Sequence, residues 1–87
     1  PDPVFSRYTA CMNLSDSLFQ VGAIEDGLPV ARQALREQTA EFREQDLHGA
    51  LVLQRNLVRL LVAAGRGEEA KPHVGECVAL ASRSGTA

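Results

Sequence analysis

The chain has 87 residues, 45% of them hydrophobic, and a formal net charge of −2, so it can form one small domain but not a large independent core. The slight negative charge and the lack of a basic run exclude the electrostatic signature of a protein that binds nucleic acid or anionic lipid. The most apolar stretch, residues 57–64, contains Arg59 and is too short to cross a bilayer. We therefore expect neither nucleic acid nor membrane as a partner. We also expect a cytoplasmic location, because the sequence shows no charged stretch followed by an apolar run of the kind that directs secretion.

Hydrophobic periodicity predicts an all-α chain without β-strands. We expect a single domain over residues 1–87, built from four helices at about residues 3–21, 26–44, 47–64 and 68–83.

The first two helices are recognised by a shared apolar face and by the signals between them. Leu14 and Leu18 are four residues apart and lie on one side of the first helix, and Gly22 follows where a left-handed residue ends a helix. Glu25 and Asp26 suit the opening turn of the second helix, where exposed N–H groups favour negative charge. The apolar stripe of the second helix is Leu28, Ala31, Leu35 and Phe42.

The third and fourth helices show the same signals. Asp46 can cap the third helix, with Gly49 an unfavourable residue in its first turn. Leu57 and Leu61 repeat the leucine spacing, and Gly65 ends the helix. The apolar stripe of the fourth helix is Ala70, Val74, Cys77, Val78 and Ala81.

These similarities reflect an internal repeat. Aligning Asn13 with Asn56 gives a shift of 43 residues (56 minus 13), and the same shift brings six identical pairs together between residues 13 and 29, where chance gives about one. The pairs are Asn13 and Asn56, Leu14 and Leu57, Leu18 and Leu61, Gly22 and Gly65, Glu25 and Glu68, and Pro29 and Pro72.

The repeated positions resemble the tetratricopeptide repeat: Asn-Leu at 13–14 and 56–57, the later leucines and glycines, and the run Gly-Arg-Gly-Glu-Glu-Ala at 65–70. The period exceeds the usual length of about 34 residues, so the chain is most similar to the long-repeat type of kinesin light chains and many bacterial regulatory proteins. The resemblance implies two antiparallel helical hairpins, at about residues 8–45 and 47–83, stacked as a short superhelix. It also implies a non-catalytic module that binds a peptide or partner protein in a concave groove.

Candidate binding residues lie on the first helix of each repeat. The resemblance implies that Asn13 and Asn56 hydrogen-bond the backbone of a bound peptide, a role for which an amide carries both donor and acceptor. Helical spacing places Arg55 and Arg59 beside Asn56, where a guanidinium fork can receive an acidic side chain or a terminal carboxylate. The alternative is that these arginines are ordinary solvated side chains, one of them paired with Asp16. If the arginines bind a ligand, the expected partner is acidic. The binding site predicted on this chain consists of Asn13, Asp16, Arg55, Asn56 and Arg59.

No pattern for catalysis, cofactor binding or metal binding is present. Cys11, Cys77, His48 and His73 are the only candidates for thiol nucleophile, base or soft metal ligand, and their spacing matches no zinc or catalytic motif. We interpret both cysteines as reduced, small apolar residues.

A second interpretation is structural. Two repeats leave apolar end faces uncovered, so Val74 and Val78 are candidates for homodimer formation or for packing against a neighbouring domain of a bacterial regulatory protein. The first residue, Pro1, and the preference for arginine over lysine suggest a piece of a longer bacterial polypeptide.

Overall fold

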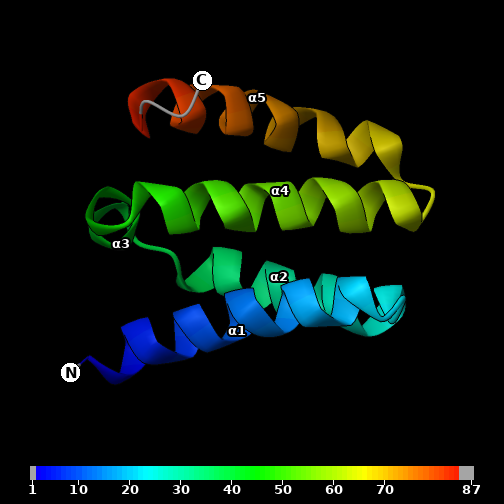
Figure 1. Ribbon diagram of the computed structural model, residues 1–87, viewed down its shortest axis with the longest axis horizontal. Helices are drawn as coiled ribbons and strands as arrows, with labels where there is room; N and C mark the ends of the chain where they lie inside the picture. The colour runs from blue at the N-terminus through cyan, green and yellow to red at the C-terminus, as the bar shows by residue number, and fades with distance from the viewer. Residues whose placement is uncertain (1, 85–87) are drawn as a thin grey trace.

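The computed structural model describes residues 2–84, which form five α-helices and, within that range, no β-strand. In chain order the helices are α1 (Pro3–Gln20), α2 (Ile24–Glu37), α3 (Ala40–Gln45), α4 (Leu47–Ala63) and α5 (Gly67–Ser84). Figure 1 shows α4 between α5 on one side and α1 with α2 on the other, and the short α3 at one end. The prediction of an all-α fold is confirmed.

A glycine with positive φ ends both α1 and α4. Gly22 has φ +81° and Gly65 has φ +76°, and these are the only such residues in the described chain. In each turn the amide of the following residue donates to a carbonyl in the last helical turn, that of Leu18 or Leu61, at 2.8 Å. This bond satisfies a carbonyl that the helix leaves unpaired, so the glycines have the predicted role.

The helix boundaries repeat with the period of the sequence. The ends of α1 and α4, Gln20 and Ala63, are 43 residues apart (63 minus 20), and so are the starts of α2 and α5, Ile24 and Gly67 (67 minus 24). In Figure 1, α2 returns beside α1 and α5 returns beside α4. The two helix–turn–helix units therefore share one register.

The expectation of a single second helix over residues 26–44 is wrong, and four expected helices become five among residues 2–84. The helix stops at Glu37, Gln38 takes an extended backbone with ψ 114°, and a new helix starts at Ala40. Thr39 caps the new helix, since its Oγ1 accepts from the amide of Phe42 at 3.0 Å.

Contacts with α1 explain the break. The Gln38 side chain donates through Nε2 to the Tyr8 hydroxyl at 2.9 Å. Phe42 packs edge-on against Phe5, with ring centroids 5.0 Å apart, and lies 5.6 Å from the Tyr8 ring. Aromatic pairs of this kind stabilise by about 0.5–1.5 kcal/mol beyond their buried area, which favours turning the chain so that Phe42 reaches the core.

Asp46 caps α4 as predicted, and Gly49 has a clear reason for its position. Asp46 Oδ1 accepts from the Gly49 amide at 2.9 Å. A Cβ at residue 49 would lie 2.2 Å from Asp46 Oδ2. The cap and a larger side chain exclude each other, so the expectation that Gly49 is merely unfavourable is corrected.

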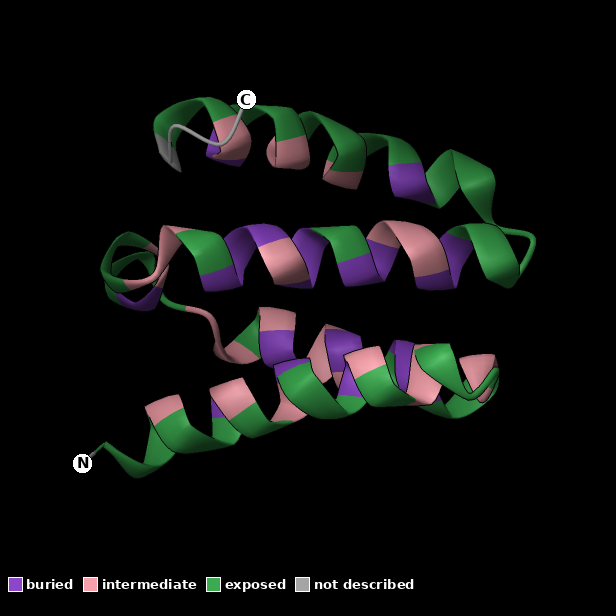
Figure 2. Ribbon diagram, in the orientation of Figure 1, coloured by how far each residue is buried: buried purple, intermediate pink, exposed green. Residues whose placement is uncertain are grey.

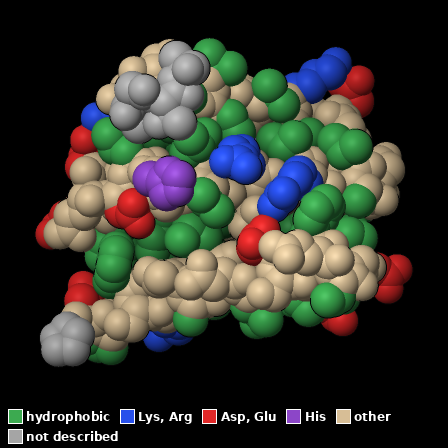
Figure 3. All heavy atoms as spheres, viewed as in Figure 1, with side chains coloured by type: hydrophobic (Ala, Val, Ile, Leu, Met, Phe, Trp, Pro, Cys, Tyr) green, Lys and Arg blue, Asp and Glu red, His purple; other side chains and the backbone are tan. Residues whose placement is uncertain are grey.

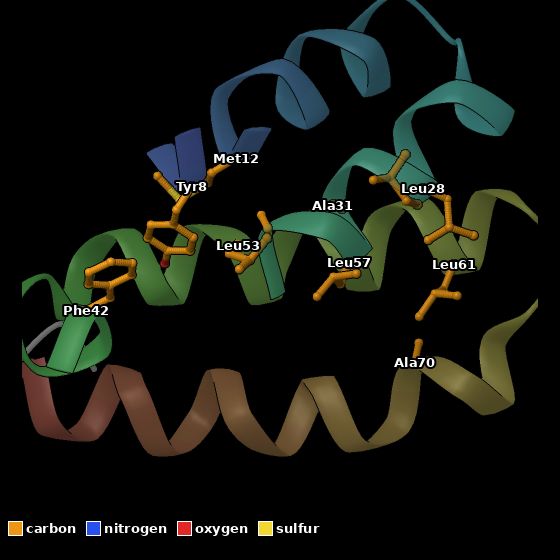
Figure 4. Close-up of a cluster of buried hydrophobic side chains, with 11 residues drawn as sticks. Tyr8, Met12, Leu28, Ala31, Phe42, Leu53, Leu57, Leu61 and Ala70 are labelled. Carbon is orange, nitrogen blue, oxygen red and sulfur yellow. The ribbon is translucent and has the colours of Figure 1, made fainter. Parts of the chain in front are cut away.

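The core lies on both sides of α4, which is the most buried helix (Figure 2). Leu53, Leu57, Leu60 and Leu61 are at most 1% exposed. Figure 4 shows Leu57 and Leu61 of α4 with Ala31 and Leu28 of α2 above them and Ala70 of α5 below. By contrast, two stripe residues predicted on α5 remain open, Val74 at 47% and Val78 at 64% exposure.

Candidate functional site

The two asparagines at equivalent positions have different environments. Asn56 is fully buried, and its Nδ2 donates to the Met12 carbonyl at 3.4 Å and to Ser15 Oγ at 3.3 Å. Asn13 is exposed on α1. Thus Asn56 joins α4 to α1 inside the protein, and only Asn13 presents its amide to the surface.

Arg59 lies between the two leading helices, α1 and α4. Its Nη2 donates to Asp16 Oδ1 and to Asn56 Oδ1, both at 2.8 Å. The guanidinium carbon is 4.5 Å from the centroid of the Phe19 ring, a cation–π distance. Its Nε is buried without a hydrogen-bond partner in the described chain. The ion pair with Asp16, anticipated as the alternative for one arginine, is present.

Arg55, one turn earlier, is exposed and forms no hydrogen bond or ion pair with any residue of the described range. It lies near Cys77 of α5. Burial raises the pKa of the Cys77 thiol, and the Arg55 charge offsets this only in part. The thiol is therefore protonated at neutral pH, while Arg55 is a cation available to a ligand.

These side chains line a shallow hollow of about 300 Å³ between α4 and α5. We define this α4/α5 groove by its lining residues, Arg55, Val58, Arg59, Val74 and Cys77. In Figure 3, basic side chains lie over α4 in the middle of the face, with hydrophobic side chains toward α5 and acidic ones toward α1. The groove thus combines apolar walls with positive charge, a combination that suits an amphipathic segment bearing a carboxylate.

A larger hollow lies between the start of α2 and the end of α4, but both of its arginines, Arg32 and Arg66, are already paired. Arg66 donates to Glu69 from Nε and Nη2, and Arg32 donates to the same carboxylate at 3.2 Å. The Arg66 hydrogen bond lowers the pKa of Glu69. The residues that line this larger hollow are Ile24, Glu25, Leu28, Pro29, Arg32, Ala63, Ala64 and Arg66.

The residues with nucleophilic or metal-binding side chains are dispersed. His73 Nδ1 donates to Gln54 Oε1 at 2.7 Å across α5 and α4, whereas His48 is exposed at the start of α4. Cys11 and Cys77 are both half-buried free thiols. Within residues 2–84 no group of three or more histidine, cysteine, aspartate or glutamate side chains is arranged to hold a metal ion.

The structure unites part of the predicted site and adds to it. Asp16, Asn56 and Arg59 form one connected cluster, Arg55 opens into the groove, and Asn13 lies apart from it on α1. Sequence reasoning missed Val58 as a lining residue and did not place Val74 beside the arginines. The 43-residue shift could have indicated Val58 and Val74, because it pairs every groove residue with an equivalent residue in the first unit.

Comparisons of the chain with protein-family models, with curated proteins and with solved structures find no match. No helix in the described range has the length and apolar character needed to cross a membrane.

Proposed function

We propose that this protein is a non-catalytic, tetratricopeptide-like module of two stacked helical hairpins, and that it binds a partner protein through the α4/α5 groove. The bound segment carries a carboxylate that pairs with Arg55. The observation on which this proposal chiefly depends is an unpaired guanidinium at the edge of an exposed apolar hollow. Arg59 contributes positive charge from a fixed position, held by Asp16 and Asn56.

The apolar side of the groove supports binding of a protein segment over binding of a small anion. Val74 is 47% exposed and the adjoining Val62 on α4 is 58% exposed. Exposed valines beside a free arginine offer both buried apolar area and charge-assisted hydrogen bonding to one ligand. Asn13 is exposed on α1 and does not line this groove.

Peptide selection tests the proposal. A random peptide library displayed on phage is selected on the immobilised protein, and the recovered peptides are synthesised. We expect enrichment of acidic peptides with apolar neighbours, and the Arg55→Glu variant should bind them at least about tenfold more weakly, since a charge-assisted hydrogen bond contributes about 1.5–3 kcal/mol. The loss should shrink as salt rises.

Arg36→Glu is the matched control, because Arg36 is also an exposed helical arginine but lies on α2, outside the groove. It should leave peptide affinity unchanged. Recovery of peptides without acidic residues, or equal affinity of wild type and Arg55→Glu, would refute the proposed site.

A second candidate function is self-association or interdomain packing, which the exposure of Val74 and Val78 favours. Single apolar residues on a surface are common, but several on one helix face mark a surface for contact. In this alternative the groove binds another folded surface in place of a peptide.

A further inference from the structure

Each residue of the α4/α5 groove has an equivalent in the first unit, and α4 already covers the surface that those equivalents form. Met12, Ser15, Ala31 and Ala34, 43 positions before four of the groove residues, are 6%, 0%, 0% and 0% exposed. The fifth equivalent, Asp16, is paired with Arg59 of α4. The groove is thus the second copy of a helix-binding surface whose first copy is occupied.

The helix that fills the first surface is α4, and its equivalent in the first unit is α1, whose corresponding face is covered by no other helix in the described range. Leu53, Asn56, Leu57 and Leu60 form the face of α4 that packs on α1 and α2, and each is at most 1% exposed. The equivalent face of α1 is exposed at every position, with Leu14 at 49%. That face, which we call the α1 outer face, consists of Ala10, Asn13, Leu14 and Ser17.

The sizes of the two free surfaces are complementary. In the occupied surface, small residues of α2, Ala31 and Ala34, receive the large leucines of α4. In the groove the equivalents are the larger Val74 and Cys77, whereas the α1 outer face is slimmer than α4, with alanine and serine in place of two leucines. The larger side chains of the groove are matched by the smaller side chains of the α1 outer face, so the total side-chain volume between the two surfaces is preserved and close packing remains possible.

The charges are exchanged in the same way. In the occupied surface, Asp16 comes from the receiving helix and Arg59 from the inserted one. When α1 of another copy is the inserted helix, it brings Asp16, and the receiving helix α4 provides Arg59. The same two residues then form an ion pair, but the acid comes from the inserted helix and the base from the receiving one. Both hydrogen bonds of Arg59 within the described chain come from Nη2, which leaves Nη1 for the second carboxylate.

We infer that the occupant of the α4/α5 groove is the α1 outer face of a second copy of this chain, so that the protein associates head to tail. The inference rests on the proposed function of the groove as a protein-binding surface and names the partner, whose carboxylate, Asp16, pairs with Arg59 in place of Arg55. Because the two contacting surfaces differ, each added copy leaves one groove and one α1 outer face free, and the assembly does not close at a dimer. The second copy's Asn13 replaces Asn56 but retains only a backbone carbonyl acceptor, since Val58 stands in place of Ser15.

Two single variants, mixed, test the geometry. Leu14→Lys blocks the α1 outer face, because it brings a positive charge toward Arg55 and Arg59, and it leaves the groove intact, whereas Val74→Lys blocks the groove and leaves the α1 outer face intact. Both residues are about half exposed, so both variants should keep wild-type circular dichroism. Val21→Glu is the control, because Val21 is 77% exposed in a turn outside both surfaces.

Sedimentation velocity and light scattering measure the outcome. The mass of the wild type and of Val21→Glu should rise continuously with concentration, and each blocked variant alone should remain at the 9.4 kDa of one chain. An equimolar mixture of the two blocked variants should form a complex of two chains and stop there, because only one intact pair of surfaces remains.

A wild type that stays monomeric at every concentration overturns the inference, as does a Leu14→Lys variant that associates like the wild type. A dimer that survives Leu14→Lys but not Val74→Lys overturns the head-to-tail geometry and indicates a symmetric contact through α5 instead. If acidic peptides bind the groove while the wild type stays monomeric, the proposed function stands and only the named occupant fails. If the mixture behaves as expected but no acidic peptide is selected, the occupant stands and the separate acidic partner is rejected.

Discussion

Asn13 and Asn56 are the same residue at the same position of two repeated units, yet another helix covers only Asn56. The buried amide donates to α1 and accepts from Arg59, so it orients the guanidinium that faces Asp16. A buried polar group of this kind is costly to leave unpaired. The role of an amide is therefore determined by what packs on it, and the repeat provides a matched pair to measure that effect.

Asn56→Ala should destabilise the protein by about 1–3 kcal/mol, because it removes buried hydrogen bonds and leaves a small void. Asn13→Ala, at the exposed equivalent, should change stability by less than about 0.5 kcal/mol. Urea unfolding followed by circular dichroism measures both at a concentration low enough to keep the chain monomeric. Similar losses in the two variants would contradict the burial of Asn56.

The imidazole of His73 makes stability depend on pH. Burial lowers the pKa of His73, the positive charge of Arg32 lowers it further, and Glu76 opposes the change in part. As pH falls below the ordinary value of about 6.5, the unfolded chain takes up the proton first, so the stability present above that pH is lost until the folded pKa is passed.

We expect the free energy of unfolding to fall in that window for the wild type, and to fall less for His73→Gln, which has no imidazole at position 73. His48→Gln, at an exposed position, is the control for removing an imidazole. Urea titrations at a series of pH values provide the comparison. A pH slope that is equal in wild type and His73→Gln would show that another group is responsible.

Among the elements, the helix ends marked by glycine could be predicted and the break at Gln38 and Thr39 could not. Gly22 and Gly65 carry a local signal, because positive φ is inexpensive only for glycine. The break contains no glycine or proline, and its cause is the contact of Phe42 and Gln38 with Tyr8, 30 or more residues away in sequence. Local propensity cannot report such a tertiary cause.

In the candidate site, too, features that depend on local sequence could be predicted, and features that depend on tertiary contacts could not. Helical spacing correctly placed Arg55 and Arg59 on one helix face and allowed the pair with Asp16. It could not tell that Asn56 is buried, because that depends on α4 lying against α1. The sequence periodicity also placed Val74 and Val78 on an apolar stripe without showing that no helix within the described range covers them.

At the start of α4, the cap and the glycine should be energetically coupled. In the wild type, Gly49→Ala should destabilise by up to about 1 kcal/mol, since the new Cβ displaces the Asp46 carboxylate from its hydrogen bond. In an Asp46→Ala background the same substitution should stabilise by about 0.5–1 kcal/mol, because only the helix preference for alanine remains.

Thermal unfolding of the four chains in this cycle measures the coupling. Gly75→Ala is the control, because a Cβ there meets nothing within 4 Å in the middle of α5, so it should stabilise in either background. Additive effects at Asp46 and Gly49 would refute the proposed conflict between cap and side chain.

Across the whole molecule, burial is unevenly distributed between two equivalent helices. α2 is covered by both α1 and α4, whereas α5 contacts α4 and buries mainly Ala70 and Leu80. Two ion pairs join α3 to α5. The pair of Arg43 with Glu76 is half-buried, the pair of Arg83 with Glu44 is exposed, and pairs this accessible to water contribute little. Opening of α5 therefore requires less free energy than opening of α2.

Hydrogen exchange read by mass spectrometry should show this difference, with amides of α5 exchanging at least about tenfold faster than those of α2 in dilute protein. Leu80→Ala should weaken α5 further, by about 2–5 kcal/mol, because Leu80 is the large side chain that seals this helix to Ala50 and Leu51. The exchange of α1 and α2 should change much less in that variant. Equal protection of α2 and α5 in the wild type would contradict the prediction, because it would mean that contact with one helix protects α5 as well as contact with two helices protects α2. Occupation of the α4/α5 groove removes the asymmetry, so raising the protein concentration should slow exchange in α5 relative to α2, and the Leu14→Lys variant should not show this slowing.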